Sequence, residues 1–404
     1  MLNYLKVRVG YGTSAGYPSP YSTRGTLDTF TKMFQTAAGS IMNSNAVSNF
    51  YANPNLKPEI HKELELGIEG RFWKNRIGID VSLYTKDSED LIIDLELDPS
   101  TGYTSSTVNS AAINNKGIEA IVNVIPVQTQ NFTWDISANF TLNRSEVTKI
   151  ADGIDQVLIA GASFLGNFAK PGLPYNMIWG APILRYYTDP NTTVEDIPYD
   201  QRKNYSPVTS SAGIYQYAGS DGFIGDPNPD YVVNVTNTIS YKWISLRAQV
   251  DHTVGGDIWG GTASTLTGRG ILEYTGFDRF VPVVVSGVDK DGNPNKVQVT
   301  PNAHYWRDTG VWYDENRIFD ASTIRLREVS LSLVAPKSWL NGTPFGRASL
   351  TFSGQNLWHL AYNFPASSNM DPEVLSLGVG NGKGFDRTTG PTSKKWGATL
   401  SFTF

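Results

Sequence analysis

A serine flanked by glycines is the first group in the sequence that could do chemistry. Gly12-Thr13-Ser14-Ala15-Gly16 matches the G-x-S-x-G pattern that carries the nucleophile of many hydrolases. In those enzymes the serine sits between a strand and a helix, whereas Tyr17-Pro18-Ser19-Pro20 opposes a helix at this place. We therefore interpret residues 12–16 as part of a strand end and loop.

Candidate metal and phosphate sites are also incomplete. Asp289-Lys290-Asp291-Gly292-Asn293 resembles the start of a calcium loop, but its glycine comes too early and no glutamate follows at the required distance. Residues 378–384 are rich in glycine but lack the spacing of a P-loop. The sequence contains no cysteine and only four, widely separated histidines. We predict no catalytic residue, no metal site and no cofactor, and we expect that the protein is not an enzyme.

Acidic residues between positions 63 and 80 could provide paired carboxylates for acid–base catalysis. Glu65 and Glu69 alternate with apolar residues, and Arg71 has the same parity. A β-strand places residues of one parity on one face. These three side chains are therefore expected to share a polar face and form ion pairs, while Leu64, Ile68 and their neighbours of like parity form the apolar face.

The same alternation recurs along the chain and predicts an all-β fold of about ten antiparallel strands. The expected strands are residues 5–11, 64–72, 77–84, 118–124, 132–142, 233–241, 244–250, 323–333, 348–356 and 396–404. The apolar parity changes between Leu326 and Val329, which predicts a β-bulge at Arg327 and Glu328.

Short and long connections alternate between these strands. The long connections are expected at residues 12–62, 85–115, 144–230, 253–321 and 357–394. Outer-membrane barrels have short periplasmic turns and long extracellular loops, and aromatic residues such as Trp73, Trp243 and Trp339 lie near the short turns, where a membrane boundary would favour them. The pattern favours an antiparallel transmembrane β-barrel whose apolar parity contacts outer-membrane lipid.

Alternation alone does not distinguish this barrel from a secreted carbohydrate-binding or structural β-sandwich, which would pack its apolar parity into a dry core. Aqueous solubility without detergent would favour the sandwich. A net charge of −5 on 404 residues argues against nucleic-acid binding, which requires a basic face.

Six short motifs, in order, resemble the SusC/RagA family of TonB-dependent outer-membrane transporters. They are Asn53-Pro54-Asn55-Leu56-Lys57-Pro58-Glu59, Asn115-Lys116-Gly117-Ile118-Glu119, Gly225-Asp226-Pro227-Asn228-Pro229-Asp230, Asp320 with Ile324-Arg325-Leu326-Arg327, Gly354-Gln355-Asn356-Leu357, and Asp371-Pro372-Glu373. The resemblance extends over nearly the whole chain.

The resemblance implies a 22-stranded barrel with a plugged lumen in the outer membrane of a Gram-negative bacterium of the Bacteroidetes. It also implies a periplasmic contact with the TonB complex and a SusD-like surface lipoprotein as a lid. This sequence resembles only the C-terminal part of such a barrel, over residues 1–404, so we expect the plug domain and the first strands to lie outside it. The implied function is nutrient import, with an oligosaccharide as the expected substrate and a peptide as the alternative.

Substrate or lid contacts are expected on the aromatic-rich loops, and polar residues on the strands are expected to line the lumen. The loop candidates are Trp179, Tyr186, Tyr187, Trp259, Tyr305, Trp306, Arg307, Trp312 and Tyr313. The lumen candidates are Glu65, Glu69, Arg71, Asp135, Asn139, Arg247 and Gln249.

Overall fold

The computed structural model describes residues 2–35, 41–189, 191–194, 196–301, 313–364, 368, 370–374, 376–377, 380–390 and 392–404. Side chains are described for these residues outside the stretch 28–45.

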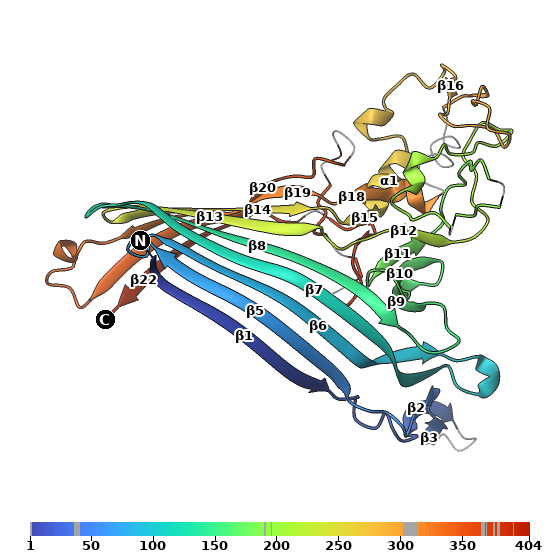
Figure 1. Cartoon of the computed structure of the whole chain (residues 1–404), viewed down its shortest axis with the longest axis horizontal. Helices are drawn as coiled ribbons and strands as arrows, with labels where there is room; N and C mark the ends of the chain where they lie inside the picture. Colours follow the sequence, from blue (N-terminus) through green and yellow to red (C-terminus); the bar gives the residue numbers. More distant parts are fainter. Residues whose placement is uncertain are drawn as a thin grey trace.

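Ten long antiparallel strands form one curved sheet, which we call the wall (Figure 1). In spatial order they are β1 (Leu2–Gly16), β5 (Glu59–Phe72), β6 (Ile77–Glu96), β7 (Ser105–Gln128), β8 (Phe132–Lys149), β13 (Tyr231–Tyr241), β14 (Ile244–Val254), β19 (Thr323–Val334), β20 (Arg347–Leu360) and β22 (Lys395–Thr403). A short strand, β4 (Phe50–Tyr51), pairs in parallel with β7. All ten predicted strands are confirmed; nine are longer than the alternation indicated, and the last is shifted by one residue.

Each wall strand pairs with the strand before it in this order, because short turns or folded loops bring consecutive strands together. Within the described residues, β1 and β22 pair on one side only and form the two edges of the sheet. Both chain ends lie near the end of the wall that carries the turns (Figure 1).

The connections divide between the two ends of the wall (Figure 1). The turns at one end are residues 73–76, 129–131, 242–243 and 335–346, and the last of these turns contains η5 (Lys337–Trp339). The prediction of a long loop at residues 85–115 is wrong. Strands β6 and β7 continue through this segment and leave only residues 97–104, with η1 (Pro99–Thr101), because the two strands stay paired as far as Glu96 and Ser105 across register shifts at Leu91.

The predicted bulge is confirmed at Arg327. Leu326 pairs with Val250 and Glu328 with Gln249 on β14, so Arg327 is the extra residue on that side. Toward β20, Leu326 pairs with Trp358 and Glu328 with Gln355, so two residues of β20 lie opposite Arg327 and β20 carries the extra one. A bulge re-aims a side chain without ending the strand, and it brings Arg327 to the face where Asp251 lies.

The loops after β8, β14 and β20 fold into a second body, which we call the cap (Figure 1). One sheet of the cap consists of β9 (Val157–Ala162), β10 (Leu165–Ala169), β11 (Met177–Gly180) and β12 (Gly222–Gly225), and a second consists of β15 (Asp257–Gly260), β18 (Ile318–Asp320) and β21 (Phe385–Asp386). A strand pair is formed by β16 (Val283–Val284) and β17 (Gln298–Val299). The cap also contains the helix α1 (Gly261–Gly268) and the 3-10 turns η2 (Arg202–Asn204), η3 (Glu273–Thr275) and η4 (Asp314–Arg317). The loop after β1 forms a separate hairpin of β2 (Leu27–Gln35) and β3 (Ile41–Val47).

Most of the buried apolar core lies in the cap, where Leu165, Ile178, Ile224, Trp259 and Phe385 form one cluster. The apolar parity of the wall is open instead: Leu64, Leu246 and Leu400 are 41%, 43% and 61% exposed. A β-sandwich would bury this face against a second sheet, so the structure gives no support to that alternative. Among the described residues, no helix has the length and apolar character needed to span a membrane.

Candidate functional site

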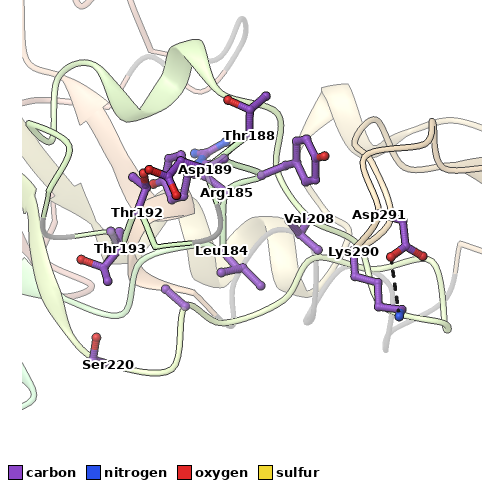
Figure 2. Close-up of a pocket in the computed structure, with 14 residues that line it drawn as sticks. Leu184, Arg185, Thr188, Asp189, Thr192, Thr193, Val208, Ser220, Lys290 and Asp291 are labelled. Atoms are coloured by element: carbon purple, nitrogen blue, oxygen red, sulfur yellow. Dashed lines mark ion pairs between the residues drawn. The ribbon is translucent and has the colours of Figure 1, made fainter.

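A depression of about 860 Å³ in the cap is open to the surface and lined by two consecutive tyrosines and by hydrogen-bonding groups (Figure 2). Its lining is Leu184, Arg185, Tyr186, Tyr187, Thr188, Asp189, Thr192, Thr193, Val194, Val208, Ala218, Ser220, Lys290 and Asp291. We call it the tyrosine depression. It brings together two segments about 100 residues apart in the sequence, residues 184–194 and the turn at residues 289–293.

Arg185 is held at the edge of this depression by Glu315. The guanidinium Nη2 contacts Glu315 Oε1, and the other carboxylate oxygen accepts the Ile183 N–H at 2.6 Å. Arg185 Nε and the Tyr187 hydroxyl are both buried and have no hydrogen-bond partner among the described residues. Burial raises the pKa of Tyr187, so its hydroxyl is a neutral donor at physiological pH. Both atoms are covered by the surrounding protein, so a ligand or water would reach them only after a local movement of the side chains around them.

Packing fixes the two tyrosine rings. The ring of Tyr187 meets that of Tyr205 edge to face, with centroids 5.0 Å apart. Tyr186 lies over Gly292, where an added Cβ would come within 2.5 Å of the tyrosine ring. Gly292 also has a φ of +84°, so the tight turn that supports Tyr186 favours glycine for two reasons.

A second depression of about 520 Å³ lies between the upper wall and the β9–β10 hairpin, and we call it the aliphatic depression. Its apolar lining is Leu91, Ile92, Ile93, Ala111, Ile113, Val147, Ile150, Val157, Leu158, Ile159 and Ala169. Glu59, Asp94 and Tyr175 contribute polar groups at the same place. This cavity suits an apolar group better than a sugar.

The other predicted loop aromatics pack inside the cap. Trp179 contacts the rings of Phe168 and Phe223. Trp259 is 7% exposed, and its indole N–H donates to Asp314 at 3.1 Å.

Tyr313 stacks on Tyr217 and donates its hydroxyl to the Tyr215 carbonyl. The structure therefore brings Tyr186 and Tyr187 to the tyrosine depression and places Trp179, Trp259 and Tyr313 elsewhere. Tyr305, Trp306, Arg307 and Trp312 lie outside the described residues.

The predicted lumen residues on β5 form the expected ion pairs. Glu69 contacts Arg71 at 3.0 Å and Arg8 of β1 at 3.9 Å, and Glu65 accepts a hydrogen bond from Ser82 at 2.8 Å. Arg8 reaches across to Asp80 at 2.6 Å.

The predicted lumen residues on the other strands are more open. Asn139 and Arg247 are exposed, and Asp135 is half-buried opposite Thr238. Gln249 donates to Asp251 at 3.0 Å.

The fold and these sites can now be compared with known proteins. The model of the family described as "TonB dependent receptor-like, beta-barrel" matches residues 2–251 of the chain. The chain belongs to the TonB-dependent receptor family. Members of this family lie in the outer membrane of Gram-negative bacteria, which explains why the apolar face of the wall is open.

Similar proteins include TonB-dependent receptor P3 of Formosa agariphila, which is 28% identical over 387 residues, 91% of this chain and 36% of that protein. TonB-dependent receptor SusC of Bacteroides thetaiotaomicron is 26% identical over 228 residues, 53% of this chain and 22% of that protein. The chain thus spans well under half the length of these receptors.

Two solved structures share the fold of the whole chain. The RagAB peptide transporter superposes with a TM-score of 0.67 at 19% identity, and the RagAB peptide importer in the closed-closed state with 0.68 at 20% identity. Each comparison covers 100% of this chain and 41% of the other. At this identity the likeness concerns the fold, and it supports the predicted SusC/RagA resemblance.

An ion-pair network joins the cap loop after β20 to the wall of this TonB-dependent receptor. Arg325 on β19 contacts Asp371, and the two side chains are 1% and 0% exposed. Arg327 contacts Asp251 of β14 and donates to Glu373 at 2.8 Å. The family resemblance rests on the motifs that contain these residues, but contact between the motifs could not be predicted from the sequence.

A group of buried carboxyls lies where the receptor's cap meets β13 and β15. Asp257 Oδ2 accepts the backbone N–H of Asp226 at 2.8 Å. Burial raises the pKa of Asp257 to about 6, and repulsion from Asp226 and Asp320 adds to the rise. Burial also raises the pKa of Asp226. These residues were not predicted as a group, because the cap places them together across 94 positions of sequence.

Proposed function

We propose that this chain forms the C-terminal part of the barrel and the extracellular cap of a receptor that imports an oligosaccharide. The observation that carries the proposal is the tyrosine depression. Two fixed rings lie beside a guanidinium N–H and a tyrosine hydroxyl that have no partner among the described residues. Aromatic faces edged by donors suit a sugar ring, which has apolar faces and a rim of hydroxyls.

The mechanism that we propose contains no covalent step. The cap selects the ligand by shape and hydrogen bonding, and the polar face of the wall, with residues such as Asp135, Asn139, Arg247 and Gln249, lines the path. Release into the periplasm would follow movement of a plug domain coupled to TonB, and a SusD-like surface lipoprotein would close over the cap. Both partners are proposed from the family.

A peptide is the second candidate substrate, favoured by the aliphatic depression. Eleven apolar residues line that cavity beside the carboxylates of Glu59 and Asp94. An aliphatic side chain of a peptide would bury apolar surface there, which a sugar ring would not. Two RagAB structures, which share the fold, are titled as those of a peptide transporter and a peptide importer.

The two candidates can be separated by calorimetric titration of the full-length receptor in detergent with a panel of neutral oligosaccharides and a panel of short peptides. Tyr187→Phe removes one hydroxyl and retains the ring, and we expect it to weaken oligosaccharide binding about five- to tenfold. Ile159→Thr keeps the branched shape in the aliphatic depression and serves as the matched control.

The oligosaccharide proposal requires loss of sugar affinity in Tyr187→Phe and unchanged affinity in Ile159→Thr. Peptide binding that weakens only in Ile159→Thr would replace it with the second candidate. Neither class binding the wild-type receptor would contradict both.

A further inference from the structure

The end of the wall that carries the short turns has basic residues and no acidic ones in its turns. The basic residues in these turns are Lys74, Arg76, Lys242 and Lys337. The turns, at residues 73–76, 129–131, 242–243 and 335–346, contain no aspartate or glutamate. Arg347 follows directly as the first residue of β20. The distribution is unusual for a chain with a net charge of −5.

The opposite end of the molecule has the reverse charge. Residues 150–230, which make up much of the cap, contain nine acidic and four basic residues. The positive charge is therefore confined to the turn end, and no acidic residue in these turns neutralises it.

The cations of the turn end are unpaired and mostly exposed. Lys74, Lys242 and Lys337 are exposed and Arg76 is half-buried, and none of the four forms an ion pair within the described residues. Arg76 donates to the Gln128 carbonyl at 3.2 Å. An unpaired surface cation is free to meet an external anion.

Large aromatic residues accompany these cations. Trp73 and Trp339 are 60% and 63% exposed, and Trp243 packs against Trp339 with centroids 5.5 Å apart. The Lys242 ammonium lies 5.3 Å from the centroid of the Tyr241 ring. Amphipathic rings prefer the boundary between hydrocarbon and head groups, so these cations lie at head-group depth.

The nearest acidic side chains do not offset this charge on the lipid side. Glu69 and Asp135 have the polar parity of their strands and belong to the inner face of the wall, where Glu69 is already paired with Arg71 and Arg8. Among the described residues of the wall, the open apolar parity near the turns, with Tyr241 and Ile239, has no aspartate or glutamate that would repel a phosphate.

We propose that the turn end binds the phosphate groups of anionic phospholipids in the periplasmic leaflet of the outer membrane. The four turn cations supply the charge, and the adjoining Trp and Tyr rings hold them at the level of the head groups. The inference uses the membrane location of the receptor and is independent of the substrate that it imports. Each cation near an anionic surface favours binding by about fivefold, so the four cations give a preference that can be measured.

The test uses the full-length receptor in detergent, titrated with phosphatidylglycerol and with phosphatidylcholine of equal chain length and followed by native mass spectrometry. The wild-type receptor should bind phosphatidylglycerol about tenfold or more tightly, with the preference falling as salt is raised. The variant Lys74→Gln, Arg76→Gln, Lys242→Gln, Lys337→Gln should lose the preference.

A matched control removes four lysines from the loop end: Lys149→Gln, Lys296→Gln, Lys394→Gln and Lys395→Gln. It should keep the preference. A third variant, Lys74→Arg, Lys242→Arg, Lys337→Arg, retains every charge and should also keep it, which separates charge from any effect on folding. Equal binding of the two lipids by the wild type, or equal loss in the turn and loop variants, would overturn the proposal.

Discussion

The wall and the cap use the same apolar residues in opposite ways. Ile68 in the wall is 47% exposed, whereas Ile178 in the cap is 0% exposed. In the wall, strand pairing satisfies the backbone and the apolar face is left for lipid, which is the only solvent where that exposure is stable. In the cap, apolar residues pack against one another in water.

This contrast shows that apolar residues of one chain can face two environments, lipid along the wall and the protein interior in the cap. The change occurs at the upper ends of the strands. The wall depends on the backbone hydrogen bonds between its strands, while the cap depends on burial and on ion pairs that attach it to the wall. Substitutions in each region, each with a matched control, test this division.

The largest effect is expected where the cap is attached to the wall. Arg325→Ala leaves the Asp371 carboxylate buried without its cation, which should destabilise the attachment of the loop by about 4 kcal/mol. Hydrogen–deuterium exchange should rise around Asp371 and Glu373. The double variant Arg325→Met, Asp371→Leu removes both charges and should recover most of the protection; if it exchanges as fast as Arg325→Ala, the uncompensated charge is not the cause.

Truncation of an isoleucine to alanine should lower the free energy of unfolding more in the cap, where it leaves a cavity, than in the wall. Ile178→Ala removes a fully buried side chain and should lower the free energy of unfolding by about 3 kcal/mol. Ile68→Ala faces lipid and should cost less than about 1 kcal/mol, because lipid tails fill the space. Thermal unfolding of both variants in the same detergent measures the difference, and equal costs would contradict the division.

A charged residue introduced on the lipid face of the wall should destabilise the protein more than one introduced on the polar face. Leu66→Arg places a cation near the middle of β5, on the face where Leu66 is 48% exposed, and should destabilise the receptor in a bilayer by about 2 to 3 kcal/mol. Thr141→Arg, on the polar parity of β8, is the control and should be tolerated. Folding yield in lipid vesicles is the measurement; a similar yield for the two variants would mean that the faces are assigned wrongly.

The smallest effect is a pH dependence that belongs to the cap. The pKa of Asp257 is raised to about 6, above its unfolded value near 4, so the folded state holds the proton more tightly. The free energy of unfolding of the cap should therefore fall as pH rises from about 4 to about 6, by about 2 kcal/mol after allowing for partial exposure. Asp257→Asn should remove the part of the fall that Asp257 contributes and leave the part from Asp226, while the exposed Asp155→Asn should retain the full fall in thermal unfolding at pH 4.5 and 7.5. An unchanged profile in Asp257→Asn would assign the titration to another group.

Much of the wall could be predicted because strand alternation is local. The ten strands, the bulge at Arg327 and the turns were readable from parity. The loop expected at residues 85–115 was wrong because the lengths of β6 and β7 depend on their pairing above the membrane, where the alternation becomes irregular at Leu91. Within the site, tyrosine content indicated the right loop but not the right residues, since Trp179 and Trp259 became part of the core.

By itself the sequence determined which side chains share a face of the wall and where the chain turns, because a two-residue period is fixed by the backbone. Only the tertiary structure decided what the long loops become. The pairing of Arg325 with Asp371, the contact of Asp226 with Asp257 and the contact of Tyr186 with the turn at Gly292 join residues far apart in sequence. Such contacts form when the cap buries its apolar residues, and no local period encodes them.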